Sequence, residues 1–184
     1  MESLETGPVP LGHTSDGGVI VGEKGAPHRL VLFEDPQCPY CRQFEEVSGE
    51  LLLRELSAKT VCIEYRMRCL LGIESVRADN ALALAAELGR FNDLRLRLFA
   101  AQPQEETGGF TIPDLIELGK LVDLDSPQYQ QGVREGRYNR WVVEMDQVFQ
   151  GLDPEGTPTA LLDGEPVDQG LLYDPSSLRK LLLV

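Results

Sequence analysis

Two cysteines, Cys38 and Cys41, lie three positions apart in this chain, with Pro39 and Tyr40 between them. Thiols at this spacing can open and close a disulfide reversibly, and the attacking species is the thiolate rather than the thiol. The free backbone N–H groups at the N-terminus of a helix stabilise a thiolate and lower its pKa. The segment therefore predicts thiol–disulfide chemistry, with Cys38 at the start of a helix and Cys41 one turn inside it.

The residues around the two cysteines predict the elements that position them. Residues 29–33 form a short apolar run, typical of a buried strand, which ends at the turn residues 35–37. Pro39 suits the first turn of a helix, because the N–H that it lacks would have had no partner there. After the cysteines, apolar residues recur at helical intervals, at Phe44, Val47, Leu51, Leu52 and Leu56. Alternative interpretations of the motif are a structural disulfide or half of a zinc site.

Length and composition limit the possible architectures and partners. The chain has 184 residues, 42% of them hydrophobic, which is enough to bury one core with a subdomain inserted into it. Its formal charge of −13 argues against nucleic acid or an anionic membrane surface as the main partner. No apolar run approaches the roughly 20 residues that a membrane span needs. The acidic start of the sequence shows no signal peptide. We therefore expect a cytoplasmic protein, or an exported or membrane-anchored one if a leader has been removed.

The sequence predicts strands near both ends of the chain and helices between them. Residues 1–16 resemble a flexible lead-in, rich in Gly, Pro, Ser and Thr, and strands are predicted at 18–22, 29–33 and 59–67. Helical patterns then occupy 76–88, 91–101, 112–122 and 138–149. A strand at 159–162, a hairpin turn at Asp163-Gly164 and a helix capped by Asp174 complete the pattern. The predicted order is β-β-α-β, a block of helices, then β-β-α.

This order resembles the DsbA-like branch of the thioredoxin superfamily. The resemblance rests on the Cys38-Pro39-Tyr40-Cys41 segment after the second strand and the Gly156-Thr157-Pro158-Thr159 segment before the hairpin, and it covers nearly the whole chain. It implies an α/β, thioredoxin-like fold built from residues 17–74 and 151–184, with an inserted α-helical domain at 75–150. It also implies a cis bond between Thr157 and Pro158, opposite the dithiol, where an extended substrate segment could pair with backbone groups.

The resemblance implies a thiol:disulfide oxidoreductase that acts on protein or peptide thiols, with a redox recycling partner and without a bound cofactor or metal. Cys38 would be the exposed nucleophile that forms a mixed disulfide, and buried Cys41 would resolve it. The direction of the reaction depends on the reduction potential and stays open. Rival hypotheses are a cytoplasmic dithiol reductase or a glutathione-linked transferase on the same fold. A metal or iron–sulfur binding module is a further rival.

Two features depart from what is common in the family. Tyr40 stands where strongly oxidising members often have a histidine, and it cannot supply positive charge to a thiolate. Leu32 stands where many members bury an acid that helps to move the proton of the resolving cysteine. Glu34 and Asp35 lie closer to the dithiol, so Glu34 is a candidate for that tuning role, whereas Asp35 also suits a simple turn.

The remaining candidates favour structural roles. We expect Cys62 and Cys69 to be buried free thiols rather than a second disulfide, and the four cysteines match zinc-site spacings poorly. The isolated His13 and His28 are expected to be solvated or locally bonded. The aromatic residues expected to pack in the core of the insertion are Tyr138, Trp141 and Phe149.

Overall fold

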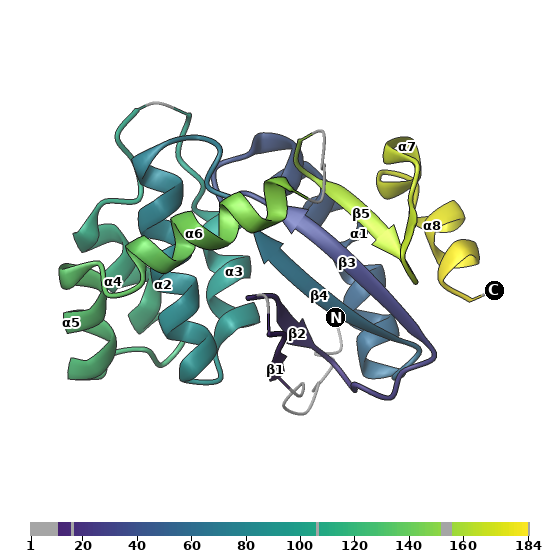
Figure 1. Cartoon of the computed structure of the whole chain (residues 1–184), viewed down its shortest axis with the longest axis horizontal. Helices are drawn as coiled ribbons and strands as arrows, with labels where there is room; N and C mark the ends of the chain where they lie inside the picture. The colour runs from purple at the N-terminus through teal and green to yellow at the C-terminus, as the bar shows by residue number, and fades with distance from the viewer. Residues whose placement is uncertain (1–10, 16, 106, 152–155, 184) are drawn as a thin grey trace.

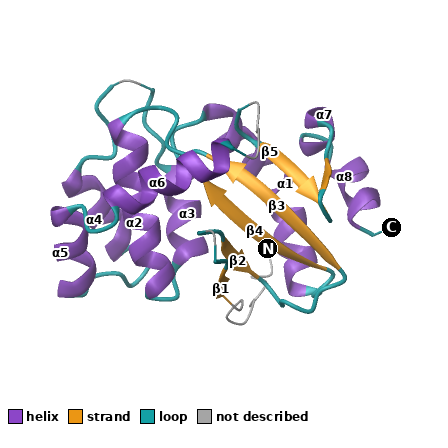
Figure 2. Cartoon of the chain, viewed as in Figure 1, coloured by secondary structure: helices purple, strands orange, loops and turns teal. Residues whose placement is uncertain are grey.

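The computed structural model describes residues 11–15, 17–105, 107–151 and 156–183. Within these ranges a mixed sheet lies beside a group of helices, as Figures 1 and 2 show, so the predicted α/β class is confirmed. The strands are β1 (Leu11–His13), β2 (Val19–Val21), β3 (His28–Glu34), β4 (Val61–Met67), β5 (Thr159–Leu162) and β6 (Glu165–Pro166). The helices are α1 (Pro39–Ser57), α2 (Ile73–Glu87), α3 (Phe91–Ala100), α4 (Ile112–Lys120), α5 (Pro127–Glu135), α6 (Asn139–Gln150), α7 (Gln169–Leu172) and α8 (Pro175–Leu182).

The sheet places β3 at its centre. In the described residues the strand order is β1-β2-β4-β3-β5-β6, and β3 runs parallel to β4 but antiparallel to β5. A strand with neighbours on both edges and elements packed over its faces needs apolar residues on both sides. Leu30, Leu32 and Phe33 are accordingly at most 1% exposed. The carboxyl end of β3 is therefore a fixed point from which the cysteine segment starts.

The beginning of the described chain corrects one expectation. Residues 11–13, which the sequence placed in a flexible lead-in, form β1 and pair with β2. β2 pairs in turn with β4. The backbone of β1 is therefore hydrogen-bonded at the edge of a sheet, and the sequence of residues 11–13 gives no sign of this partner. Residues 1–10 and 16, which belong to the same predicted lead-in, lie outside the described residues.

Helices α2 to α6 follow one another between β4 and β5, where the sequence predicted a helical insertion. Thr111 caps α4, with its hydroxyl accepting the Asp114 N–H. The sequence reading missed α5, although its ends carry clear signals. Ser126 caps it, Pro127 occupies its first turn and Gly136, with a φ of 58°, ends it in the left-handed conformation. Pro127 therefore stands at the start of a helix, where its missing N–H needs no partner.

The last part of the chain follows the prediction closely. β5 and β6 form a hairpin whose turn residues, Asp163 and Gly164, have φ values of 52° and 94°. This is the positive-φ geometry that favours Asp-Gly at such a turn. Asp174 caps α8 by accepting two backbone N–H groups, and Pro175 follows it in the first turn. The short helix α7, capped by Asp168, was not predicted.

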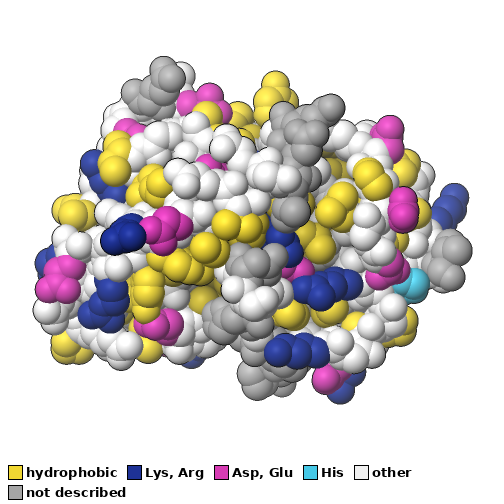
Figure 3. All heavy atoms as spheres, in the orientation of Figure 1, with side chains coloured by type: hydrophobic (Ala, Val, Ile, Leu, Met, Phe, Trp, Pro, Cys, Tyr) yellow, Lys and Arg dark blue, Asp and Glu magenta, His cyan; other side chains and the backbone are white. Residues whose placement is uncertain are grey.

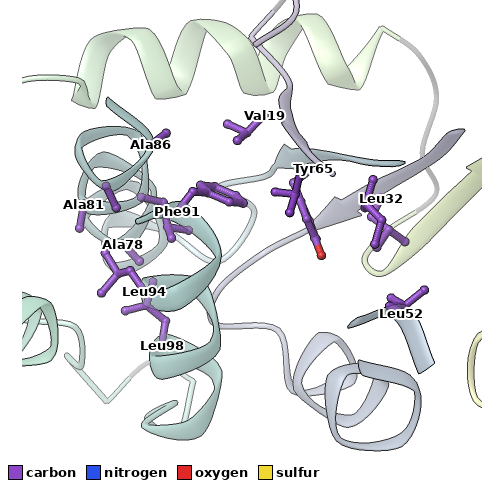
Figure 4. Packing of buried hydrophobic residues seen from close by; sticks show 14 of the residues in the cluster. Val19, Leu32, Leu52, Tyr65, Ala78, Ala81, Ala86, Phe91, Leu94 and Leu98 are labelled. Carbon is purple, nitrogen blue, oxygen red and sulfur yellow. The ribbon is translucent and has the colours of Figure 1, made fainter. Parts of the chain in front are cut away.

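The sheet and the helical insertion share a cluster of buried apolar side chains. Figure 4 shows Leu32 and Leu52 on one side of Tyr65, and Phe91 with the alanines of α2 on the other. The ring centroids of Tyr65 and Phe91 are 5.5 Å apart. Helix α1 packs against β4, α3 and α8, so it contacts both parts of the fold. The start of α1 is consequently held from two sides, by the sheet and by the insertion.

Candidate functional site

Cys38 and Cys41 lie at the junction of β3 and α1, as the sequence predicted. After β3 the chain turns through Asp35, and the Cys38 N–H donates to the Asp35 carbonyl oxygen at 3.0 Å. Cys38 is the N-cap residue of α1, and Pro39 follows it in the first turn. The Cys38 sulfur is therefore next to the N–H groups of Tyr40 and Cys41 at the positive end of the helix dipole.

Cys38 faces the loop that carries Thr157 and Pro158. Its sulfur lies 3.2 Å from the Thr157 carbonyl oxygen, and the Thr157–Pro158 peptide bond is cis. The pairing of β5 with β3, in which Thr159 stands opposite Phe33, brings this loop to the dithiol. The two segments that carry the family resemblance therefore form one site.

Both cysteines are buried, which corrects the expectation of an exposed Cys38. Cys38 is 6% exposed and Cys41 is 0% exposed. Phe99 of α3 and Leu71 of the β4–α2 connection pack against them, and the Thr157 carbonyl lies over the Cys38 sulfur. Cys38 remains the only one of the two that presents any surface to a substrate.

The two thiols differ in pKa. A hydrogen bond from the Cys41 side chain lowers the pKa of Cys38 to about 6; burial opposes this, and the Thr157 side chain supports it. Burial raises the pKa of Cys41 well above its usual range, and the neighbouring Cys38 and Glu34 raise it further. At neutral pH Cys38 is therefore mainly a thiolate and Cys41 a thiol, which matches the roles of an attacking and a resolving cysteine.

Glu34, the predicted tuning residue, is fully buried at the end of β3. Arg95 of α3 donates to both of its carboxylate oxygens at 2.7 Å, and it also pairs with Glu45 of α1 at 2.8 Å. Burial raises the pKa of Glu34, whereas the Arg95 guanidinium lowers it. An acid thus lies near Cys41, but it comes from position 34 and not from position 32, where this chain has a leucine. The bidentate ion pair with Arg95 fixes its orientation.

Arg95 was missed by the sequence reading, although the pattern of α3 contained a signal. Phe91, Leu94 and Leu98 form the core-facing stripe of this helix, and Arg95 falls on the same stripe. Its side chain is buried, and the guanidinium carbon lies 4.4 Å from the Tyr65 ring centroid. A charged residue at a core-facing position requires a buried partner of opposite charge, and Glu34 provides one.

Asp35 has a structural role that exceeds that of a turn residue. Its carboxylate accepts the backbone N–H groups of Gln37 at 2.8 Å and of Leu70 and Leu71 at 2.8 and 3.2 Å. It also accepts the Ser75 hydroxyl at 2.7 Å. The side chain therefore connects the turn before Cys38 to the β4–α2 connection and to the start of α2.

Two further residues form hydrogen bonds with the backbone of the cysteine segment, Tyr173 through Tyr40 and Gln102 through Cys38. Tyr40 is 63% exposed, and its carbonyl oxygen accepts the Tyr173 hydroxyl at 3.2 Å. Gln102, which follows α3, was not predicted. Its amide nitrogen donates to the carbonyl oxygens of Pro36 at 2.9 Å and Cys38 at 3.0 Å. Nothing in the local pattern distinguishes this glutamine from other loop residues.

Asp79 of α2 is another buried acid, and neither of its carboxylate oxygens has a hydrogen-bond partner in the described part of the chain. It lines a cavity of about 30 Å³ together with Trp141 and Met145 of α6. Figure 3 shows apolar side chains gathered along α6. Trp141 is 37% exposed, so its predicted place in the core is wrong, whereas Phe149 is buried and packs against Phe33. Burial raises the pKa of Asp79 well above its usual range.

The other cysteines are free thiols, as predicted, with Cys62 buried and Cys69 only half-buried. Burial raises the pKa of both, that of Cys69 to about 12. His28 pairs with Asp163 at 2.8 Å, and the side chain of His13 lies outside the described part. Among the described residues no group of His, Cys, Asp and Glu side chains is placed to hold a metal ion. None of the described helices combines the length and apolar character of a membrane span.

Comparison with known proteins assigns the chain to a family. A family model described as Thioredoxin matches residues 14–182. Among curated proteins, the Na(+)/H(+) antiporter NhaA 3 of Salinispora tropica is 27% identical over 145 residues, and NhaA 1 of Salinispora arenicola is 27% identical over 148. Each alignment covers 79% of this chain and 21% of the antiporter, so the chain spans about a fifth of the length of these relatives.

Solved structures match over nearly the full chain. Oxidised BdbD from Bacillus subtilis has a TM-score of 0.81 at 19% identity and covers 96% of this chain and 97% of its own. MdbA, a thiol-disulfide oxidoreductase from Actinomyces oris, has a TM-score of 0.78 at 24% identity, with coverages of 99% and 92%. Reduced DsbA from Mycobacterium tuberculosis has a TM-score of 0.69 at 20% identity, with coverages of 92% and 93%. These matches include the inserted helices as well as the sheet, and together with the family model they show that the chain belongs to the thioredoxin family.

Proposed function

We propose that this chain is a DsbA-like thiol:disulfide oxidoreductase that exchanges disulfides with protein or peptide thiols through Cys38 and Cys41. The observation that carries the proposal is the placement of the Cys38 sulfur at the N-terminus of α1, facing the Thr157–Pro158 loop. The lowered pKa of Cys38 and the raised pKa of Cys41 support a division between attacking and resolving thiols. The solved structures of thiol-disulfide oxidoreductases on the same fold support the reaction class.

In the reducing direction, the Cys38 thiolate attacks one sulfur of a substrate disulfide. A bond forms between Cys38 and that sulfur, the substrate disulfide breaks, and the departing substrate thiolate takes up a proton. Cys41 then loses its proton and attacks the Cys38 sulfur, which forms the Cys38–Cys41 disulfide and releases the second substrate thiol. Glu34 lies near enough to Cys41 to influence its pKa, and we assign it the tuning of this second step. The reverse sequence oxidises a substrate dithiol.

Either direction leaves the dithiol in the opposite redox state, so a recycling partner is required for turnover. The preferred direction follows from the reduction potential, and stabilising the Cys38 thiolate makes the enzyme more oxidising. A Cys38 pKa of about 6 lies between the value of about 7 for thioredoxin and about 3.5 for DsbA. We therefore expect a potential between those of a strong reductant and a strong oxidant. A redox titration of the Cys38–Cys41 pair against glutathione measures it.

A trapping experiment tests the proposal. In a Cys41→Ser variant the mixed disulfide cannot be resolved, so adducts through Cys38 should accumulate with peptide disulfides and in cell extracts. A Cys38→Ser variant is the matched control and should form none. The buried Cys62 and half-buried Cys69 are replaced by serine in both variants, so that any adduct is assigned to one sulfur. If Cys41→Ser reacts no faster than Cys38→Ser at pH 7, the proposed function is wrong.

A further inference from the structure

An open groove of about 530 Å³ lies directly beside the dithiol. Gln37, Pro39 and Arg42, at the start of α1, line one wall, and the segment 102–105 of the insertion lines the other. Gln37 and Pro39 flank Cys38 in sequence, so the groove adjoins the more exposed of the two cysteines of the dithiol. Gln102 holds the two walls together through its bonds to the Pro36 and Cys38 carbonyls. A chain bound through a sulfur at Cys38 has its neighbouring residues next to this groove.

Two of the residues that line the groove have a buried polar atom without a hydrogen-bond partner among the described residues. Gln37 is fully buried, and its amide nitrogen donates to Leu71 at 3.1 Å and Ser75 at 3.4 Å. Its Oε1 has no partner among the described residues. A buried acceptor without a partner is unfavourable, so the Gln37 amide has an incomplete set of hydrogen bonds in the free protein. The buried Nε of Arg42 also lacks a hydrogen bond, because Glu46 lies 3.5 Å away in a largely exposed pair.

The charges in the lining are balanced. Arg42 contributes a cation on one wall, and Glu105 contributes an anion on the other. A ligand with a single charge would meet attraction on one wall and repulsion on the opposite one. A carboxamide instead has an oxygen that can accept from Arg42 and an NH₂ group that can donate to Glu105. The groove therefore fits an uncharged, hydrogen-bonding side chain better than an apolar or a singly charged one.

We propose that this groove is the substrate subsite beside the reactive cysteine, and that it selects cysteine peptides with a glutamine or asparagine next to the cysteine. The proposal rests on the function proposed above, because the groove matters only if a substrate sulfur reaches Cys38. The insertion supplies half of the subsite through Gln102, Gln104 and Glu105. Arg42 is the residue that determines the preference.

Peptides of the form acetyl-Ala-X-Cys-X-Ala-amide, with X as Gln, Leu, Glu or Lys, test this selectivity. The rate at which each peptide reduces the oxidised protein is divided by its rate with a small aromatic disulfide, which corrects for the peptide thiol pKa. The Gln peptide should react about threefold to tenfold faster than the Leu peptide, the range expected for one or two net hydrogen bonds. The Glu and Lys peptides should fall between them or below.

Matched variants separate the groove from the rest of α1. Arg42→Met keeps the aliphatic stem and should bring the Gln-to-Leu rate ratio close to one. Arg54→Met is the control, because Arg54 also pairs with a glutamate one turn away, Glu50, but does not line the groove. It should retain the wild-type ratio. Thermal unfolding of both variants confirms that they are folded.

The outcomes distinguish the two proposals. Equal rates for all four peptides, or an unchanged ratio in Arg42→Met, would overturn the subsite while leaving the oxidoreductase intact, provided that dithiothreitol reduces the Cys38–Cys41 disulfide and each peptide reacts through Cys38. A preference for the Leu peptide would also overturn it. If no peptide reacts through Cys38, the proposed function itself fails.

Discussion

The Cys38 sulfur and the Thr157 carbonyl oxygen lie 3.2 Å apart, although 119 positions separate the two residues. A carbonyl oxygen accepts a hydrogen bond from a thiol but offers nothing to a thiolate, so this contact alone favours the protonated form of Cys38. The pKa of Cys38 is nevertheless lowered to about 6, with the hydrogen bond from Cys41 as the largest cause. The thiolate therefore depends on identifiable donors, and the two that are side chains, Cys41 and Thr157, can be replaced.

Replacing Cys41 should raise the pKa of Cys38. Cys41→Ala removes the hydrogen bond that contributes most to the lowered pKa, whereas Cys41→Ser keeps a donor at that position. We expect the Cys38 pKa to increase in the order wild type, Cys41→Ser, Cys41→Ala. Thiolate absorbance at 240 nm, measured against pH in a background without Cys62 and Cys69, checks the order. Equal pKa values in the two variants would contradict it.

Replacing the Thr157 side chain should also raise the Cys38 pKa, by less than Cys41→Ala does. The Thr157 side chain is the second favourable contribution, and Thr157→Val removes its hydroxyl at nearly constant volume. The pH dependence of alkylation by iodoacetamide reports the change as a shift of the midpoint to higher pH. Thr60→Val is the control, since the Thr60 hydroxyl bonds to Glu55 and does not contact the dithiol. An unshifted midpoint in Thr157→Val would exclude this role.

Removing Arg95 should strongly destabilise the fold. Arg95→Met leaves Glu34 buried without its bidentate partner, and breaking a buried pair on one side typically costs about 3–5 kcal/mol. The double variant Glu34→Gln, Arg95→Met should recover most of the free energy of unfolding. Urea denaturation of the two single variants and the double variant gives the coupling energy.

The control for this cycle is Arg90→Met. Arg90 precedes the same helix, but its pairs with Asp93 and Asp123 are exposed, so the loss should stay below about 1 kcal/mol. Comparable losses in Arg90→Met and Arg95→Met would show that the buried pair contributes no more than a surface pair.

Asp79 should make stability fall as pH rises. Its folded-state pKa lies well above the ordinary 3.8, so below that value the carboxyl is protonated in both states. Above it, the unfolded chain releases the proton while the folded chain retains it, and the free energy of unfolding decreases with pH. Asp79→Asn cannot ionise, so its stability relative to wild type should grow steadily between pH 4 and pH 8.

Urea unfolding of both proteins at pH 4, 6 and 8 measures this trend, and the contributions of other titrating groups cancel in the difference. Asp93→Asn, at an exposed position on α3, should show a constant difference from wild type. A constant difference for Asp79→Asn as well would mean that Asp79 titrates normally in the folded protein.

The sequence alone predicted those elements whose turns and caps are formed by residues that are neighbours in the chain. The Asp163-Gly164 turn has the positive φ values that its residues tolerate, and Asp174 caps α8 through neighbours two and three positions away. The strand, dithiol and helix order followed from periodicity for the same reason. β1 could not be predicted in this way, because its partner strand is held in place by a third strand.

The same distinction applies to the site. Cys38 and Cys41 were recognisable from their spacing, and Thr157 with Pro158 from the family resemblance. The burial of Cys38 depends on Phe99 and Leu71, which come from parts of the chain that no local pattern connects to the dithiol. Arg95 was detectable in principle, as a charge on an apolar stripe, but its partner Glu34 lies 61 positions away and is brought to it only by the fold. Gln102 gave no signal at all.

Asp35 limits which parts of this protein can be exchanged. One carboxylate accepts four donors from the turn before Cys38, the β4–α2 connection and α2, so these segments share a single anchor. A foreign helical insertion grafted onto this sheet would need to supply the Leu70 and Leu71 amides and the Ser75 hydroxyl in the same places. Further along the insertion, Gln102 gives the α3–α4 connection a second anchor, because it donates to the Pro36 and Cys38 carbonyls. Natural variation and engineering should therefore keep the length and shape of the first residues after β4 and of the segment around Gln102.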